Sequence, residues 1–292
     1  MLRIGLLIFL FLSVSNLISS QEKFEYVGGL KLNDSTIVSF KINFTEKAGK
    51  VRGFSITDIG GEHETMSNIF GEYNKDNKEL SFREIGIVYT KSPVSQDDFC
   101  FLNVTAKNFV FGKTKSIKTN FVGLFSDSTT CIDGKIILNT IENVEKRMIK
   151  VTDKISKSKK ISDSIKEKLD VIKMMDSLQM NILRKNETLS YFTKSKKLKF
   201  IIYDGGQDDG DKINIIVNGK ALLKSYTANS SKKHLEIELT TYKTSVVVEA
   251  INEGTIAPNT VVVKIDDGKN SIRALSNLKT LERTQIDILK SN

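Results

Sequence analysis

The densest group of residues that could bind a ligand is an acidic run with the sequence Asp-Gly-Gly-Gln-Asp-Asp-Gly-Asp. Its four carboxylates stand among three glycines and belong to Asp204, Asp208, Asp209 and Asp211. Carboxylate oxygens are preferred ligands of Ca²⁺, which takes about six to eight oxygens. The spacing does not fit the helix-loop-helix calcium motif, because Ile216 stands where that motif has its last glutamate. The run predicts either a calcium site or a tight loop whose aspartates hydrogen-bond their own backbone.

The only two cysteines in the chain, Cys100 and Cys131, allow two kinds of chemistry. In an oxidising compartment an even pair of cysteines forms one disulfide, and closing a loop of about 30 residues stabilises the fold by about 3–4 kcal/mol. The alternative is a nucleophilic Cys100 assisted by His63, which requires a free thiolate. Pairing leaves no thiolate, so we predict a disulfide between Cys100 and Cys131.

No catalytic constellation in the sequence has its partners in place. The chain has only two histidines, His63 and His234, which excludes a multi-histidine metal site. It contains no Gly-x-Ser-x-Gly elbow, no phosphate-binding glycine loop and no dinucleotide fingerprint. We therefore expect a non-catalytic protein with no catalytic residues. Calcium at the acidic run is the only candidate cofactor.

The first 20 residues have the pattern of a secretory signal peptide. Arg3 supplies the positive start, residues 5–12 are apolar, and a polar stretch of small residues precedes Gln21. The apolar core of about eight residues is far shorter than the roughly 20 that a membrane-spanning helix needs. We expect cleavage after Ser20 and no transmembrane segment in the mature chain. The protein would be exported to the periplasm, the cell surface or the medium.

Residues 21–141 show the period-two alternation of half-buried strands, clearest in TIVSFKINF at 36–44. Short turns connect consecutive strands, which favours an antiparallel, barrel-like (lipocalin-like) domain over a sandwich. Twelve phenylalanines lie between positions 24 and 125. They favour a packed interior over a ligand cavity. The further strands expected are 51–58, 67–73, 79–82, 99–105, 116–125 and 134–138.

Residues 142–199 are expected to form a basic helical connector. Apolar residues recur at steps of three and four from Val144 to Met175, and the helical pattern extends to about Ser190. The polar stretch SKSKK at 156–160 predicts a break between two helices. An apolar stripe of this kind implies that the helices dock on a neighbouring domain or on a partner.

Residues 200–292 return to strand patterning and predict a β-sandwich of the immunoglobulin-like or jelly-roll type. Asn218-Gly219 between two apolar runs is a strong two-residue hairpin signal. The strands expected are 199–203, 212–217, 221–226, 234–239, 244–251, 259–265 and 284–289.

The same segment contains two elements that together resemble a known module. They are the turn Asp209-Gly210-Asp211 and the run from Gly254 to Thr260, which reads Gly-x-x-x-Pro-Asn-Thr. Residues 198–290, about a third of the chain, resemble an uncharacterised β-sandwich module of secreted Bacteroidota proteins. Ala257 stands where that family has a second proline. The resemblance implies export and a β-sandwich, and it implies no established activity.

The net charge of +9 is concentrated in one segment of the chain. Residues 21–141 carry 15 basic and 15 acidic side chains, and residues 200–292 carry 12 of each. The connector at 142–199 carries 16 basic and 8 acidic side chains. Two neutral β domains make nucleic acid an improbable partner. The connector could contact an acidic partner or an anionic membrane surface, but we favour a solvated brace.

These observations predict an exported, non-catalytic binding or adaptor protein that engages an unidentified protein partner. The alternatives are a carrier that holds a small apolar ligand in the barrel lumen, and a calcium-dependent glycan binder that uses the acidic run. The chain has no Trp, which argues against the glycan-binding hypothesis, because proteins usually stack Trp on sugar rings.

Overall fold

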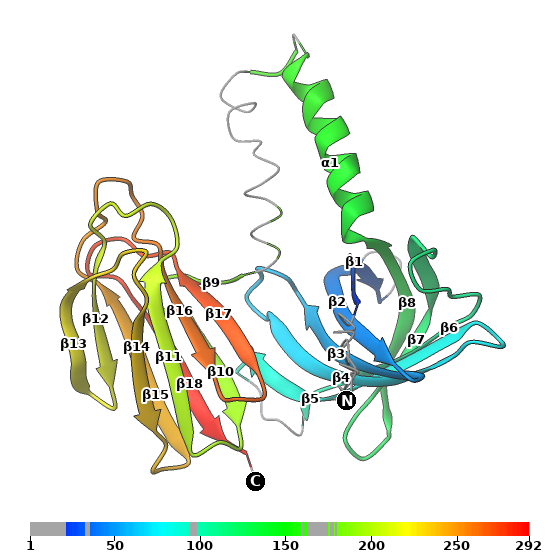
Figure 1. The fold of residues 1–292 in the computed structure, drawn as a ribbon, viewed down its shortest axis with the longest axis horizontal. Helices are drawn as coiled ribbons and strands as arrows, with labels where there is room; N and C mark the ends of the chain where they lie inside the picture. The colour runs from blue at the N-terminus through cyan, green and yellow to red at the C-terminus, as the bar shows by residue number, and fades with distance from the viewer. Residues whose placement is uncertain are drawn as a thin grey trace, which may run out of the picture.

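The structure is a computed structural model, and it describes residues 22–32, 36–93, 98–158, 160–162, 175, 178 and 180–291. The described chain is mainly β, as predicted (Figure 1). The expected signal peptide lies outside the described residues. The strands of the first half are β1 (Lys23–Lys31), β2 (Ile37–Lys47), β3 (Lys50–Thr57), β4 (Thr65–Asn74), β5 (Glu79–Thr90), β6 (Phe101–Ala106), β7 (Ser116–Leu124) and β8 (Thr130–Thr140).

These eight strands close into an antiparallel barrel. Each strand pairs with the next one in the sequence, and β8 pairs back with β1. The predicted barrel is therefore confirmed. Strand β5 continues to Thr90, well beyond its predicted end at Phe82. Two register shifts against β4 interrupt the alternation of inward and outward residues in β5. The second half of β5 therefore lacks the period-two sequence pattern by which strands were predicted.

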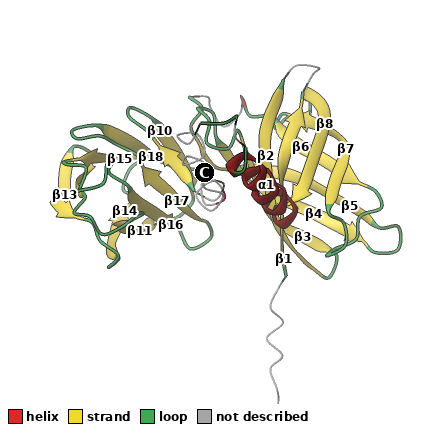
Figure 2. Cartoon of the chain, turned by 90° about the horizontal axis from the view of Figure 1, so that it is seen from above, coloured by secondary structure: helices red, strands yellow, loops and turns green. Residues whose placement is uncertain are grey.

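The remaining strands form a second unit beside the barrel (Figures 1 and 2). They make two sheets, ordered β13-β12-β15-β18-β10 and β14-β11-β16-β17-β9, whose buried side chains share one core. Their bounds are β9 (Asn181–Leu183), β10 (Thr188–Thr193), β11 (Lys197–Asp204), β12 (Lys212–Val217), β13 (Lys220–Thr227), β14 (Lys233–Glu238), β15 (Lys243–Ala250), β16 (Val261–Asp266), β17 (Ser271–Ser276) and β18 (Arg283–Lys290).

The second unit is joined to the barrel by hydrogen-bonded strands. β10 pairs with the end of β5 through Ser190 opposite Thr90 and Tyr191 opposite Tyr89, so one sheet runs from the barrel into the C-terminal half. The buried ammonium of Lys91 adds a hydrogen bond to the carbonyl of Ile182, 2.6 Å away. A separate sandwich domain over 200–292 stays a prediction.

The connector is only partly helical in the described residues. Helix α1 (Ile141–Ser156) follows β8 directly, and none of its side chains is fully buried. The expected helical pattern up to Ser190 is wrong for β9 and β10, which are strands. Leu189 and Tyr191 of β10 are fully buried in the C-terminal core, and aromatic and β-branched residues favour such a strand. The second expected helix lies almost wholly outside the described residues.

Within the described part of the chain, no helix combines the length and the apolar composition that a membrane crossing requires.

Candidate functional site

The barrel lumen is open at one end, where a cavity of about 440 Å³ lies among inward-facing side chains. All eight strands contribute to its wall, so the cavity lies inside the barrel and not on its outer surface. Most of the wall is apolar. One residue from each strand in turn is Leu30, Val38, Thr57, Ser67, Ile87, Leu102, Phe121 and Ile132.

The opposite end of the lumen is closed by aromatic rings. The loop between β6 and β7 places the Phe111 ring 4.6 Å from the rings of Phe24 and Tyr73, and 5.0 Å from that of Phe109, measured between centroids. The Tyr73 hydroxyl donates a hydrogen bond to the Phe109 carbonyl at 3.1 Å. The expected packed interior therefore exists at this end, whereas the other end keeps the cavity.

Glu84 of β5 places a carboxyl in the wall of the cavity, which Asp58 and His63 also line. Its side chain is buried, and each oxygen accepts a hydrogen bond. The Ser55 hydroxyl donates to Oε1 at 2.5 Å, and the Leu102 amide donates to Oε2 at 2.8 Å. Burial raises the pKa of Glu84 to about 7, although both hydrogen bonds favour the charged form and pull the pKa down. Near neutral pH this carboxyl can take up or release a proton.

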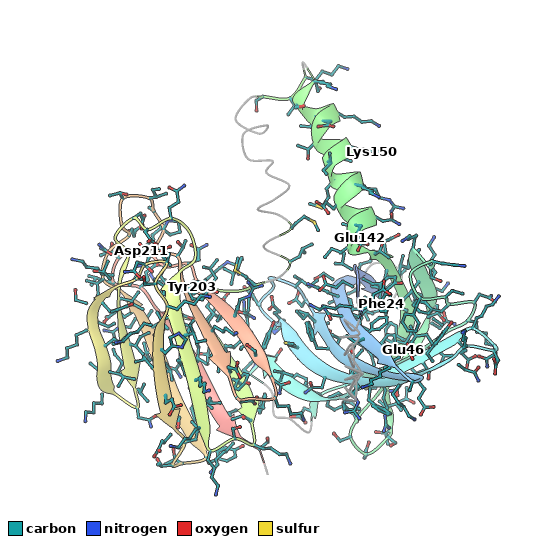
Figure 3. The ribbon with its side chains drawn as sticks, in the orientation of Figure 1. Phe24, Glu46, Glu142, Lys150, Tyr203 and Asp211 are labelled. Carbon is teal, nitrogen blue, oxygen red and sulfur yellow. A yellow bond between two sulfur atoms is a disulfide. The ribbon has the colours of Figure 1, made fainter. Side chains whose placement is uncertain are left out.

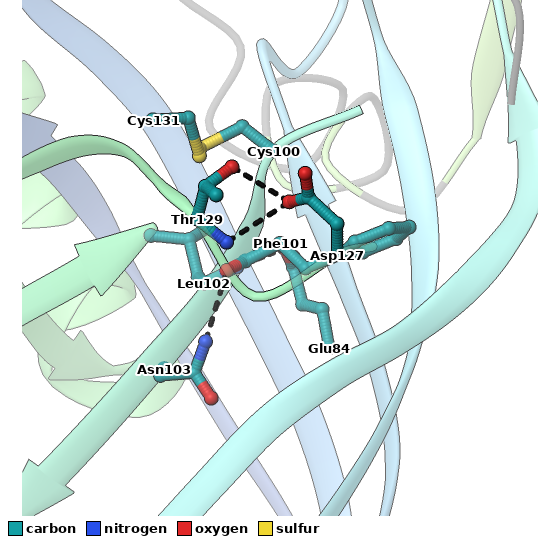
Figure 4. Close-up of a disulfide and its surroundings, with 8 residues drawn as sticks. All are labelled: Glu84, Cys100, Phe101, Leu102, Asn103, Asp127, Thr129 and Cys131. Carbon is teal, nitrogen blue, oxygen red and sulfur yellow. Dashed lines mark hydrogen bonds between the residues drawn. A yellow bond between two sulfur atoms is a disulfide. The ribbon is translucent and has the colours of Figure 1, made fainter. Parts of the chain in front are cut away.

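The predicted disulfide joins Cys100 and Cys131 beside the cavity, with their Cα atoms 6.0 Å apart (Figure 4). It ties the residue before β6 to β8, and Cys100 itself lines the cavity. The nucleophilic alternative is wrong, because Cys100 has no free thiol. His63 instead has its Nδ1 atom 3.3 Å from the Ser92 hydroxyl.

Three of the four aspartates in the acidic run meet at the loop end of the C-terminal strands, where Figure 3 labels Asp211. One oxygen from each of Asp204, Asp209 and Asp211 lies within 4.8 Å of the others. Asp208 is exposed and accepts a hydrogen bond from the Ser230 hydroxyl at 2.8 Å, outside this group. We call the three clustered residues the aspartate cluster.

Backbone amides fix each carboxylate of the aspartate cluster through one oxygen. Two of these amides come from residues 254–260, which are distant in the sequence. The other oxygen of each carboxylate, Asp204 Oδ2, Asp209 Oδ1 and Asp211 Oδ1, is buried and has no hydrogen-bond partner among the described residues. The three amide bonds run from Gly206 to Asp204 (2.8 Å), from Ile256 to Asp209 (2.8 Å) and from Thr260 to Asp211 (2.7 Å).

The electrostatics of the aspartate cluster reflect crowded negative charge. Burial raises the pKa of Asp211 to about 6, the Thr260 amide lowers it, and the negative charges of Asp209 and Asp204 raise it further. Burial likewise raises the pKa of Asp204. Asp204 and Asp211 thus resist ionisation within the cluster.

Glu84 is absent from the sequence-based predictions, although its position carries a signal. It follows Leu80 and Phe82 at steps of two, so the alternation of a strand places it inward. A single acid at an inward position of a barrel strand is a candidate site residue, because an unneeded buried carboxyl costs stability.

Comparisons with known proteins do not identify a function for this chain. No family model matches the chain, and no curated protein matches it. Among solved structures, the chain is similar to the Bacteroides ovatus mixed-linkage glucan utilization locus protein SGBP-B in complex with a mixed-linkage heptasaccharide. The identity is 7% and the TM-score is 0.18, with 92% of this chain and 60% of that chain covered. The chain thus spans less than two thirds of that protein, and a TM-score this low carries no argument.

Proposed function

We propose that the protein is a non-catalytic binding protein that holds a small apolar ligand in the open end of its barrel. The observation that carries this proposal is the cavity of about 440 Å³ whose wall is supplied by all eight strands. Sites for small molecules are concave, mostly apolar and about 300–1,000 Å³ in volume, with a few placed polar groups. The aromatic rings close the far end of the lumen.

Glu84 indicates which polar group the ligand carries. Each of its oxygens keeps acceptor capacity after the bonds from Ser55 and Leu102. A ligand with one amine or hydroxyl group can donate a hydrogen bond to this carboxyl. The lining also includes Asp58, so an anionic head group would meet two acidic side chains, which is unfavourable. The proposed ligand is therefore an apolar body with one donor group.

We also propose export and a C-terminal β-sandwich, as the sequence predicts. Export is supported by the disulfide between Cys100 and Cys131, because such bonds persist in oxidising compartments. A C-terminal β-sandwich is supported by the two sheets that share one core. An adaptor role with a protein partner, and contact of the basic connector at 142–199 with a membrane surface, are further proposals from the sequence.

The test uses N-phenyl-1-naphthylamine, a neutral apolar amine whose fluorescence rises in apolar surroundings, and the full mature chain. We expect saturable binding of one probe molecule per chain. Val38 lies at the open end, and Val38→Trp fills the cavity, so it should lower the probe affinity at least about tenfold. The matched control is Val122→Trp, because Val122 lies on the outside of β7 with 43% of its side chain exposed.

The control should bind the probe as the unmodified chain does. Thermal unfolding of both variants establishes that each is folded before binding is compared. The proposal is overturned if the folded chain does not bind the probe, or if Val38→Trp and Val122→Trp bind it equally well.

A further inference from the structure

The aspartate cluster lies outside the barrel and has no role in the proposed lumen site. Three carboxylates from one short stretch of chain bring their oxygens within 4.8 Å of one another. Asp211 is fully buried and Asp204 is 7% exposed, so solvent can do little to screen them. Like charges held this close in a poorly solvated site repel each other strongly.

The hydrogen bonds of the cluster leave one oxygen of each carboxylate without a donor among the described residues. Each aspartate uses one oxygen to accept a backbone amide, which fixes the direction of its second oxygen. The three second oxygens, on Asp204, Asp209 and Asp211, are buried without a hydrogen-bond donor in the described part of the chain. A buried acceptor without a partner is unfavourable, and more so when it is charged. Because the three residues also bring carboxylate oxygens within 4.8 Å of one another, a single cation can satisfy them together.

We propose that Asp204, Asp209 and Asp211 bind one Ca²⁺ ion. The donors are all oxygen, whereas zinc and copper favour nitrogen and sulfur ligands. Ca²⁺ accepts irregular coordination by carboxylates, backbone carbonyls and water, which suits ligands from a loop. Mg²⁺ is smaller and requires nearly octahedral geometry, so it fits such a loop less well.

A second loop is shaped to support this site. Gly254 has a φ of +57°, and a Cβ added there would lie 2.3 Å from Asp209 Oδ1. Only glycine leaves room for the carboxylate at that place. The amides of Ile256 and Thr260 in the same loop hold Asp209 and Asp211. The ion would therefore fasten the loop after β11 to the loop before β16, and its binding would stabilise the C-terminal half.

The experiment titrates Ca²⁺ into the full mature chain after dialysis against EDTA, with calorimetry and thermal unfolding as readouts. We expect one site, and a rise in Tm of about 5–10 °C at a hundredfold excess of Ca²⁺ over its Kd. Asp209→Asn should weaken Ca²⁺ binding at least about tenfold. Without Ca²⁺ this variant should unfold at the same temperature as the unmodified chain or higher, because a repelling charge has been removed.

The matched control is Asp208→Asn, which changes the same residue type in the same loop but outside the cluster. It should keep both the affinity and the Tm shift. The proposal is overturned if the unmodified chain shows no heat and no Tm shift at about 10 mM Ca²⁺, or if Asp208→Asn loses as much affinity as Asp209→Asn. Binding of Mg²⁺ as tight as that of Ca²⁺ would overturn the choice of metal.

Discussion

Glu84 and the aspartate cluster are two buried acidic sites that differ in how their oxygens are satisfied. In the barrel, both oxygens of Glu84 accept hydrogen bonds, from the Ser55 hydroxyl and the Leu102 amide. In the C-terminal loops, each member of the aspartate cluster has one hydrogen-bonded oxygen and one buried oxygen without a donor among the described residues. Burial raises the pKa of carboxyls at both sites.

The comparison teaches that burial alone does not define the chemistry of an acid. A single carboxyl with both oxygens satisfied can change its charge by taking up a proton, and it can then meet a ligand that donates or accepts. Three clustered carboxyls, each with an unsatisfied oxygen, repel one another unless a cation lies between them. The same physical cause therefore supports a small-molecule site in one half and a metal site in the other.

The largest expected effect concerns the pH dependence contributed by Glu84. Its folded-state pKa of about 7 lies above the ordinary 4.5, so the folded state binds the proton more tightly than the unfolded state. The free energy of unfolding should fall by about 3 kcal/mol from pH 4.5 to pH 7 through this group, and stay level above pH 7. Glu84→Gln removes this contribution, so its stability relative to the unmodified chain should rise over that range.

Urea unfolding at a series of pH values measures the difference between the two curves. The matched control is Glu72→Gln on β4, whose side chain is 62% exposed. Its curve should stay parallel to that of the unmodified chain above pH 5. Parallel curves for Glu84→Gln as well would show that burial does not tune Glu84.

The barrel was predictable because its strands follow elementary rules. In β2 the alternation that fully buries Phe40, Ile42 and Phe44 is visible in the sequence. Short turns between consecutive strands make an up-and-down order the simplest one. β10 was not predictable, because its first residues fall within the helical pattern expected up to about Ser190. Only the C-terminal core, formed by distant strands, makes Tyr191 an interior residue.

Neither site could be predicted in full from the sequence. The acidic run is conspicuous, but the direction of each side chain depends on turns. The sequence therefore cannot separate Asp208 from the aspartate cluster, nor place the amide of Thr260 beside Asp211 across 49 residues. Glu84 is missed for a different reason. It continues the alternation of Leu80 and Phe82, but the predicted strand ends at Phe82, so its inward position is not assigned.

The next largest effect tests the loop that supports the aspartate cluster. Gly254→Ala puts a Cβ 2.3 Å from Asp209 Oδ1 and a side chain at a φ of +57°. We expect a loss of about 2 kcal/mol in the free energy of unfolding, and a Ca²⁺ affinity lowered at least about tenfold because Asp209 is displaced. Urea unfolding and calorimetry measure the two quantities.

The control for this change is Gly219→Ala in the hairpin between β12 and β13, outside the aspartate cluster. Gly219 also has a positive φ, of +80°, but a Cβ there meets nothing within 4 Å. It should lose stability through backbone strain and keep its Ca²⁺ affinity. If both variants bind Ca²⁺ equally, displacement of Asp209 does not matter and the aspartate cluster is not the site.

The smallest effect tests whether hydrogen bonds hold the charge of Glu84. Ser55→Ala removes the donor to Oε1 and leaves that oxygen buried without a partner. Because this bond favours the charged form, its loss should raise the pKa of Glu84 further and cost about 1–2 kcal/mol of stability above pH 7, with a smaller cost at pH 5. Ser67→Ala changes another serine of the lumen wall and should leave the pKa of Glu84 unchanged. Carboxyl ¹³C chemical shifts report that pKa directly, and equal values in the two variants would show that Ser55 does not tune Glu84.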